Sequence, residues 1–166
     1  MTTDHLKIPK TLKEVILWVH PEGRVVGSLF LREQSVHHAG AEEPLEVLNQ
    51  GEHFVVLQRE EPTELRFYNR ASIIRVEYPG DKPPCDGAQG TKALPCQLNM
   101  MDGSLIAGTI CEPLPPDHSR LFDYLNRDPD RFIRIYLDEQ TVCLVNKAYI
   151  IQVSPPPGET WLAETE

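Results

Sequence analysis

Short apolar runs rich in β-branched and aromatic residues occupy the first half of the chain, and turn residues separate them. Runs of this length and composition predict β-strands. A short helix is expected over residues 44–49, because Pro44 suits a first helical position and Asn49 suits a cap. Residues 1–12 are expected to form a polar lead-in with at most one helical turn. The predicted strands are 15–19, 24–31, 54–58, 65–68 and 73–77.

The second half shows the same order of apolar and polar segments. A linker over residues 78–92 is rich in Pro and Gly and is expected to be neither helix nor strand. A helix is predicted over residues 117–125, with apolar side chains on one face. The predicted strands are 96–100, 104–111, 132–137, 141–145 and 150–153.

One eight-residue pattern occurs twice, as NRASIIRV at residues 69–76 and NKAYIIQV at residues 146–153. The two copies are 77 residues apart, and the helix-ending Asn49 and Asn126 have the same spacing. Self-similarity at a fixed spacing predicts a tandem duplication. The predicted organisation is a lead-in (1–12), a first repeat (13–79), a linker (80–92), a second repeat (93–153) and an acidic Pro-rich tail (154–166). Units of about 65 residues are marginal alone, so we expect them to share a buried interface.

Each predicted repeat has five short antiparallel strands, with a glycine inside the second one (Gly27 and Gly108). A mid-strand glycine allows the sharp bend that curls a small sheet into a barrel. The predicted fold is therefore mainly β with short helices (α+β). It consists of two tandem five-stranded antiparallel barrels, each with a helical insert between strands 2 and 3.

The segments 25–27, 54–57 and 67–76 resemble the Sm-like small β-barrel superfamily, in particular the bacterial Sm-like RNA chaperone. That resemblance covers about 40 residues of each repeat and implies RNA contacts at Asn69, Arg70, Asn146 and Lys147. The chain departs from the family pattern in its long insert, in the fusion of two units, and in its lack of a basic, aromatic-lined pore.

The formal net charge is −9, and no segment forms a basic block. Polyphosphate binding normally needs clustered Lys and Arg, so the charge pattern argues against a nucleic-acid or anionic-membrane partner. A fold can still gather scattered bases on one face. The RNA-binding alternative therefore adds Arg131 and Arg134 to the residues that the resemblance implies.

The four cysteines lack the spacing of a zinc site, and each is expected to be a free, buried, small apolar side chain. The N-terminal residues carry no apolar signal core, and the apolar runs are too short to span a bilayer, so a cytoplasmic location is expected.

No motif for hydrolysis or for phosphate binding occurs, and the expectation is a protein that is not an enzyme and binds no cofactor. The adjacent His37 and His38 form the only His pair. Neighbouring residues of a strand point to opposite faces, which is poor geometry for joint metal ligation. No metal site is expected.

Alternation in the last strand of each repeat places Ile73 and Ile150 on the outer face. Cover by the inserted helix, a seam between the two units and a docking surface for another protein are all compatible with this placement. Trp161 and Leu162 in the tail resemble a short docking peptide, although Trp161 could equally pack on its own barrel.

The preferred hypothesis is a non-catalytic cytoplasmic adaptor or scaffold that contacts another protein through Ile73, Ile150, Trp161 and Leu162. The alternative is an RNA-binding Sm-like protein. A homo-oligomer is compatible with both, and a membrane partner with neither.

Overall fold

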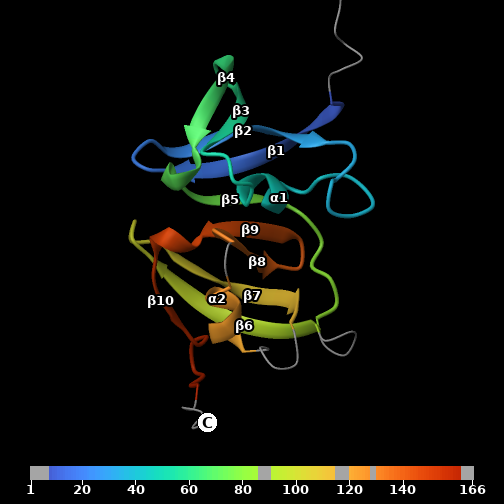
Figure 1. Cartoon of the computed structure of the whole chain (residues 1–166). Coiled ribbons are helices and arrows are strands. Elements are labelled where there is room, and N and C mark those ends of the chain that lie inside the picture. Colours follow the sequence, from blue (N-terminus) through green and yellow to red (C-terminus); the bar gives the residue numbers. More distant parts are fainter. Residues whose placement is uncertain (1–7, 86–90, 115–119, 128–129, 162–166) are drawn as a thin grey trace, which may run out of the picture. The chain divides into compact units, whose positions relative to one another are not determined.

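The computed structural model describes residues 8–85, 91–114, 120–127 and 130–161. Contacts divide the chain into two units, Met1–Val76 and Glu77–Glu166. Strands dominate both units, and the helices are short (Figure 1).

The first unit contains a long opening hairpin, a one-turn helix and a second hairpin. Its order of neighbouring strands is β5-β1-β2-β3-β4. Helix α1 begins with Pro44 in its first turn, as the sequence predicts. The elements are β1 (Lys10–Val19), β2 (Gly23–Arg32), α1 (Pro44–Leu48), β3 (Phe54–Glu60), β4 (Thr63–Asn69), the 3₁₀ turn η2 (Arg70–Ser72) and β5 (Ile73–Pro79).

The second unit has the strand order β10-β6-β7-β8-β9, which is the order of the first unit element for element. The part of the predicted helix at residues 117–119 lies outside the described residues. The elements are β6 (Thr91–Met100), β7 (Leu105–Pro113), α2 (Leu121–Leu125), β8 (Phe132–Asp138), β9 (Thr141–Asn146), the 3₁₀ turn η4 (Lys147–Tyr149) and β10 (Ile150–Ser154).

The first strand of each unit is longer than the sequence predicts. β1 starts at Lys10, inside the expected lead-in, because its pairing with β2 runs from Lys10 opposite Arg32 to Val19 opposite Gly23. β6 starts at Thr91, inside the expected linker, where it pairs with Pro113. A complete ladder with a long neighbour holds polar residues in a strand even where their own pattern is weak.

In the first unit the core lies mainly on one face of β1, β2 and β3, whereas β8 and β9 of the second unit are buried on both faces. In the first unit it includes Val15, Leu17, Val25, Leu29 and Leu57, all at most 1% exposed. In the second unit the largest fully buried side chains are Leu98, Met100, Ile110, Phe132, Ile133, Ile135 and Leu144. Successive residues of a strand point to opposite faces, so the adjacent buried residues Phe132 and Ile133 show that β8 is covered on both faces.

Gly27 and Gly108 are required by the close approach of two strands. A Cβ atom on Gly27 would lie 2.6 Å from the carbonyl oxygen of Gln58, and one on Gly108 would lie 2.5 Å from that of Tyr136. Any side chain at these two positions would therefore push β2 from β3, or β7 from β8.

The repeated Asn-base-Ala pattern forms the same local structure twice. The side chain of Asn69 accepts a hydrogen bond from the Ala71 amide at 2.9 Å, and Asn146 accepts one from Ala148 at 3.0 Å. The base that follows each Asn donates to backbone carbonyls near the end of the preceding helix: Arg70 to Leu48, and Lys147 to Leu125 and Arg127. The pattern thus ends one strand and ties the next turn to the helix.

Candidate interaction face of the first unit

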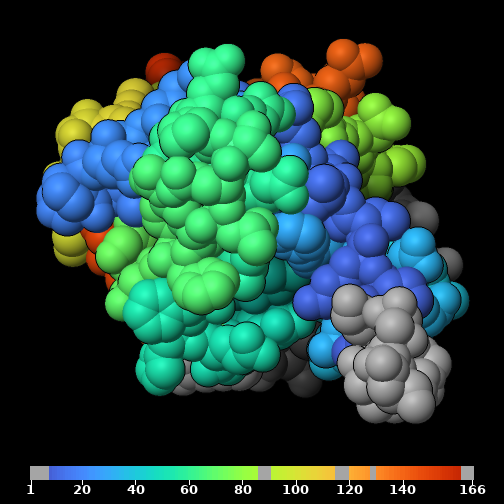
Figure 2. Space-filling view, turned by 90° about the horizontal axis from the view of Figure 1, so that it is seen from above, coloured from blue at the N-terminus to red at the C-terminus, as the bar shows by residue number. Residues whose placement is uncertain are grey.

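The β3–β4 hairpin exposes a ladder of large apolar side chains on one face. Phe54 is 55% exposed, Val56 38%, Leu65 58% and Phe67 70%. Val56 and Phe67 are direct cross-strand partners, and Phe54 and Leu65 lie two residues along their own strands on the same side. We call these four residues the apolar face. Figure 2 shows the hairpin, in teal to green, at the surface of the molecule.

The alternation of the two strands explains why the apolar face is solvent-exposed. Val55 and Leu57 point to the core and are 5% and 0% exposed. The cross-strand partners of these core residues are Tyr68 and Arg66. The inner face of β3 therefore supplies the contribution of this strand to the core. Packing of the core does not require apolar residues on the outer face of β3.

The outer face continues from the hairpin onto β2 and β1. Phe30 of β2 is half-buried and pairs with Leu12 of β1, which is 52% exposed. A shallow pocket lies where the two parts meet. Its outer-face and rim residues are Lys10, Phe30, Arg32, Glu52, Phe54 and Val56.

Strand β4 is the end strand of the first unit and is paired with β3 on one side. Its other edge therefore offers backbone N–H and C=O groups to an added strand. Natural proteins usually protect such an edge with charges or cover, but Leu65 and Phe67 are beside it instead.

Acidic side chains mark the hairpin tip. Glu60 is hydrogen-bonded to Glu14, and this contact together with the charge of Glu14 raises the pKa of Glu60. Glu61 follows in the turn and is exposed. One end of the apolar face is thus a concentration of carboxylates.

Ion pairs stiffen the opposite side of the hairpin. Arg59 donates to Glu22 at 2.6 Å and to the hydroxyl of Tyr68 at 3.2 Å. Tyr68 in turn donates to Glu22 at 3.3 Å. These contacts tie the β3–β4 hairpin to the β1–β2 turn and hold its apolar face in place.

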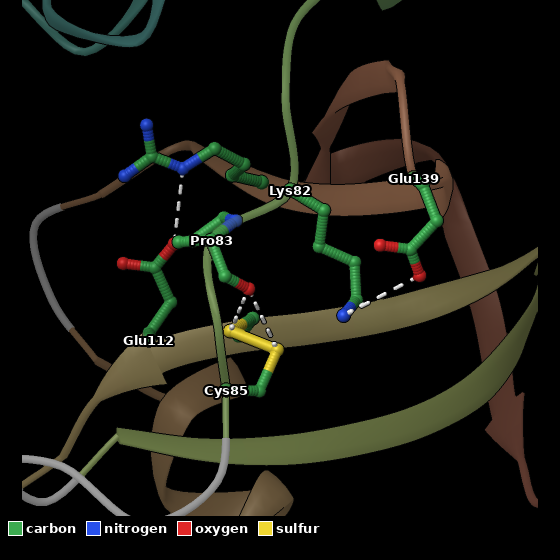
Figure 3. Close-up of a disulfide and its surroundings, with 7 residues drawn as sticks. Lys82, Pro83, Cys85, Glu112 and Glu139 are labelled. Atoms are coloured by element: carbon green, nitrogen blue, oxygen red, sulfur yellow. Dashed lines mark hydrogen bonds and ion pairs between the residues drawn. A yellow bond between two sulfur atoms is a disulfide. The ribbon is translucent and has the colours of Figure 1, made fainter.

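A disulfide joins Cys85 to Cys111 of β7 (Figure 3). The expectation of four free cysteines is therefore wrong for these two residues. It is correct for Cys96 and Cys143, which are free and buried. Sequence spacing gave no sign of the bond, because the disulfide depends on the path of residues 80–85.

Those residues run along the outer side of the second sheet. The amide of Gly80 donates to the carbonyl of Gln140 at 3.0 Å, and that of Lys82 to the carbonyl of Glu139 at 2.9 Å. The carbonyl oxygen of Pro83 lies 3.7 Å from Sγ of Cys111 (Figure 3). The segment is thus fixed at both ends.

The residues predicted to bind protein differ in exposure. Ile73 is 0% exposed, so the structure shows no exposed docking surface at this residue. Ile150 is half-buried, whereas its neighbour Ile151 is 63% exposed. Trp161 is 49% exposed, and Leu162 lies outside the described residues. Alternation identified two faces of each last strand but not which face would be covered.

The residues named for RNA binding have structural partners. Asn69, Arg70, Asn146 and Lys147 form the turn contacts described above. Arg134 donates to Glu112 at 3.0 Å. The amide of Lys147 donates to the carbonyl of Arg131 at 2.9 Å.

His38, Glu43 and Glu46 form a cluster whose ligand atoms lie within 4.8 Å of one another. Hydrogen bonds within the loop use these atoms. Glu46 accepts from Ser35 Oγ at 2.7 Å and from the amide of Glu43 at 3.0 Å, and it also contacts Nε2 of His38. The cluster fastens the β2–α1 loop to the start of the helix.

The apolar face was missed by sequence reasoning, although a signal was present. In residues 64–68 the charged and apolar side chains alternate, with Leu65 and Phe67 on one side and Glu64 and Arg66 on the other. The pattern specifies two faces. It does not say that the charged one would turn inward to the Glu22 network.

Within the described residues, no helix has the length and apolarity needed to cross a membrane. No protein-family model, curated protein sequence or solved structure matches the chain.

Proposed function

We propose that this chain is a non-catalytic adaptor or scaffold that binds another protein through the apolar face of its first unit. The observation that carries the proposal is the ladder of four exposed apolar side chains beside an open strand edge. Contiguous exposed apolar surface is uncommon on monomeric proteins and marks interaction sites. Aromatic side chains such as Phe54 and Phe67 are enriched at protein interfaces.

The proposal includes a finer view of the fold, in which the two units are copies of one Sm-like or SH3-like barrel with a helical insert. Three observations support it: the shared strand order, the close approaches at Gly27 and Gly108, and the Asn-base turn that contacts the preceding helix in both units. α1 and α2 both lie between the second and third strands of their units.

A capture experiment with matched variants tests the proposed surface. The double variant Leu65→Thr, Phe67→Thr removes the apolar side chains and keeps residues that favour strands. Its control is Leu105→Thr, which removes an exposed apolar side chain, 56% exposed, from the second unit. Both proteins are used to capture partners from native lysate treated with ribonuclease, and the bound proteins are quantified by mass spectrometry.

The expected result is that the double variant loses partners that the wild type and Leu105→Thr retain. Circular dichroism confirms that all three proteins are folded. Equal partner sets for the double variant and the wild type would remove the apolar face as the binding surface.

A further inference from the structure

Residues 80–85 show what a segment bound to the outer face of such a sheet looks like. The segment is extended and contains Pro83 and Pro84. Its Gly80 lies against Val142 of β9, since a Cβ on that glycine would be 2.8 Å from Cγ2 of Val142. At the other end Cys85 is bonded to Cys111 of β7. The segment therefore passes over the sheet from β9 toward β7.

A lysine accompanies the prolines. Nζ of Lys82 lies 3.8 Å from a carboxylate oxygen of Glu139 in the β8–β9 turn (Figure 3). The Lys82 side chain is 20% exposed, so most of its stem is covered while its ammonium group faces the acidic turn. The bound segment thus combines proline and glycine with one acid, Asp81, and one base, Lys82.

Strand register shows which positions of the first unit correspond to this site. In the first unit Ser28 of β2 pairs with Gln58 of β3, which pairs with Leu65 of β4. In the second unit Thr109 of β7 pairs with Tyr136 of β8, which pairs with Val142 of β9. Leu65 is therefore the equivalent of Val142. By the same register Phe30 corresponds to Cys111, and the turn residue Glu61 to Glu139.

The two equivalent sites differ in cover. Val142 is 4% exposed and Cys111 3%, whereas Leu65 is 58% exposed. The acidic turn is present in both units, as Glu60-Glu61 and as Asp138-Glu139. On the second unit, an acidic turn and an apolar platform hold residues 80–85. The first unit has an equivalent acidic turn and an equivalent apolar platform.

We propose that the apolar face of the first unit binds an extended, proline-containing segment of another protein that carries a lysine or arginine. By this correspondence the glycine of the segment lies over Leu65, as Gly80 lies against Val142, and the prolines lie toward Phe30, as Pro83 lies toward Cys111. The base pairs with Glu61, the equivalent of Glu139, in the acidic turn. This inference rests on the proposed function and names the chemistry of the partner. A preformed extended segment loses little conformational entropy on binding, which favours prolines in such a site.

Charge argues against the chain's own tail as the occupant. The tail contains three consecutive prolines, Pro155–Pro157, but its charged residues are Glu159, Glu164 and Glu166. Those carboxylates would meet Glu60 and Glu61, and like charges brought together oppose binding. The same repulsion applies to the tail of a second copy of the chain, which is the competing outcome of the test.

The test uses the full-length oxidised chain and the hexapeptide PGDKPP, the sequence of residues 79–84. Binding is followed by backbone amide chemical shifts. In the full chain the second site is filled by its own segment, so the expected result is saturable shifts confined to β3, β4 and the Glu60–Glu61 turn. Affinity is expected to be weak, in the millimolar range, because the peptide is short and untethered.

Two charge changes sharpen the experiment. The reference is the affinity of PGDKPP for the wild-type chain. Replacing the peptide by PGDEPP, or the protein by the variant Glu60→Lys, Glu61→Lys, should each lower this affinity by about tenfold or more. The PGDEPP peptide should regain binding to the Lys variant. This rescue is not expected from a purely structural effect of the substitutions.

Unchanged amide shifts with PGDKPP, or equal affinity for PGDEPP, would overturn the proposed partner chemistry. If the capture experiment still depends on Leu65 and Phe67 in that case, the surface stands and only the chemistry of its occupant is wrong. Sedimentation velocity adds the last arm. A dimer that dissociates when residues 154–166 are removed would assign the face to a second copy and overturn the proposal.

Discussion

At the scale of single residues, two glycines and two asparagines set the geometry on which the rest depends. Gly27 and Gly108 permit a backbone contact that no side chain allows. Asn69 and Asn146 replace a missing backbone partner at the break before each last strand. The sequence already indicated these positions, since all four belong to the repeated pattern or to equivalent strands.

Alanine at Gly27 or Gly108 should destabilise the chain. The added Cβ meets a backbone oxygen, which cannot move without shifting a strand, and overpacking of this kind costs about 1–3 kcal/mol. Gly51→Ala is the matched control, because nothing lies within 4 Å of its Cβ position. Urea unfolding measures the free energy. Midpoints equal to that of the control would show that the strands separate without cost.

Loss of either turn asparagine should also destabilise. Asn69→Ala removes an acceptor and is expected to cost about 1 kcal/mol. The cost at Asn146 should be larger, because this side chain is 0% exposed and its truncation would also leave a gap in the packing. Asn→Asp at each site keeps the acceptor oxygen. If the Ala and Asp variants melt alike, the hydrogen bond is not what stabilises the turn.

At the scale of elements, the alternation of apolar residues predicted the strands and the position of α1, because inward-facing positions must be apolar in any packing of these sheets. The alternation could not predict that Ile73 is buried and that Leu65 is exposed. Alternation fixes which residues share a face, whereas the covering of a face depends on residues distant in sequence. The early start of β1 was missed for a related reason, since residues 10–14 are polar except for Leu12 and are held by the β2 ladder.

The β2–α1 loop should be most firmly held between pH 4.5 and pH 6.5. The hydrogen bond to the Ala39 carbonyl and the contact with Glu46 raise the pKa of His38 above its ordinary 6.5. Burial would raise the pKa of Glu46, but hydrogen bonds from Ser35, the Glu43 amide and His38 outweigh it and lower that pKa below 4.5.

A raised His pKa stabilises the folded loop below 6.5, and this contribution is lost as pH rises through the raised value. A lowered Glu pKa stabilises above 4.5, and this contribution is lost as pH falls through the lowered value. Hydrogen exchange of the Glu43 amide, corrected for intrinsic rates, should be slowest inside this window. His38→Gln should remove the loss on the alkaline side; an unchanged profile would mean that His38 does not titrate against Glu46.

At the scale of the whole molecule, the disulfide between Cys85 and Cys111 is the feature that no local sequence pattern predicted. It closes a segment of 26 residues and secures residues 80–85 to the second unit. Pairings of this kind follow from the path of a chain through space, so a single sequence with four cysteines leaves the connectivity open.

Two of the four cysteines should resist alkylation after denaturation without reductant, and mass spectrometry of the digest should recover Cys85 linked to Cys111. In the native state Cys96 should also be unreactive, because burial raises the pKa of its thiol to about 11. Modification of all four residues in denatured, unreduced protein would show that the bond is absent.

Reduction should lower the stability of the second unit by about 3.5 kcal/mol, the chain-entropy value for a loop of this length. Cys85→Ala, Cys111→Ala should behave like the reduced protein and should not respond further to dithiothreitol. If dithiothreitol lowered the stability of that double variant, the effect of the reductant would not come from the Cys85–Cys111 bond.

The uncovered ladder on β3 and β4 has a consequence for descent. Folding demands an apolar residue at Leu57 but not at Leu65 or Phe67, so a lineage that lost its partner could change the latter two freely. In such a lineage, substitution of residues 65 and 67 by Thr, Ser or Lys, with residue 57 unchanged, would mark the point at which binding to the partner was lost.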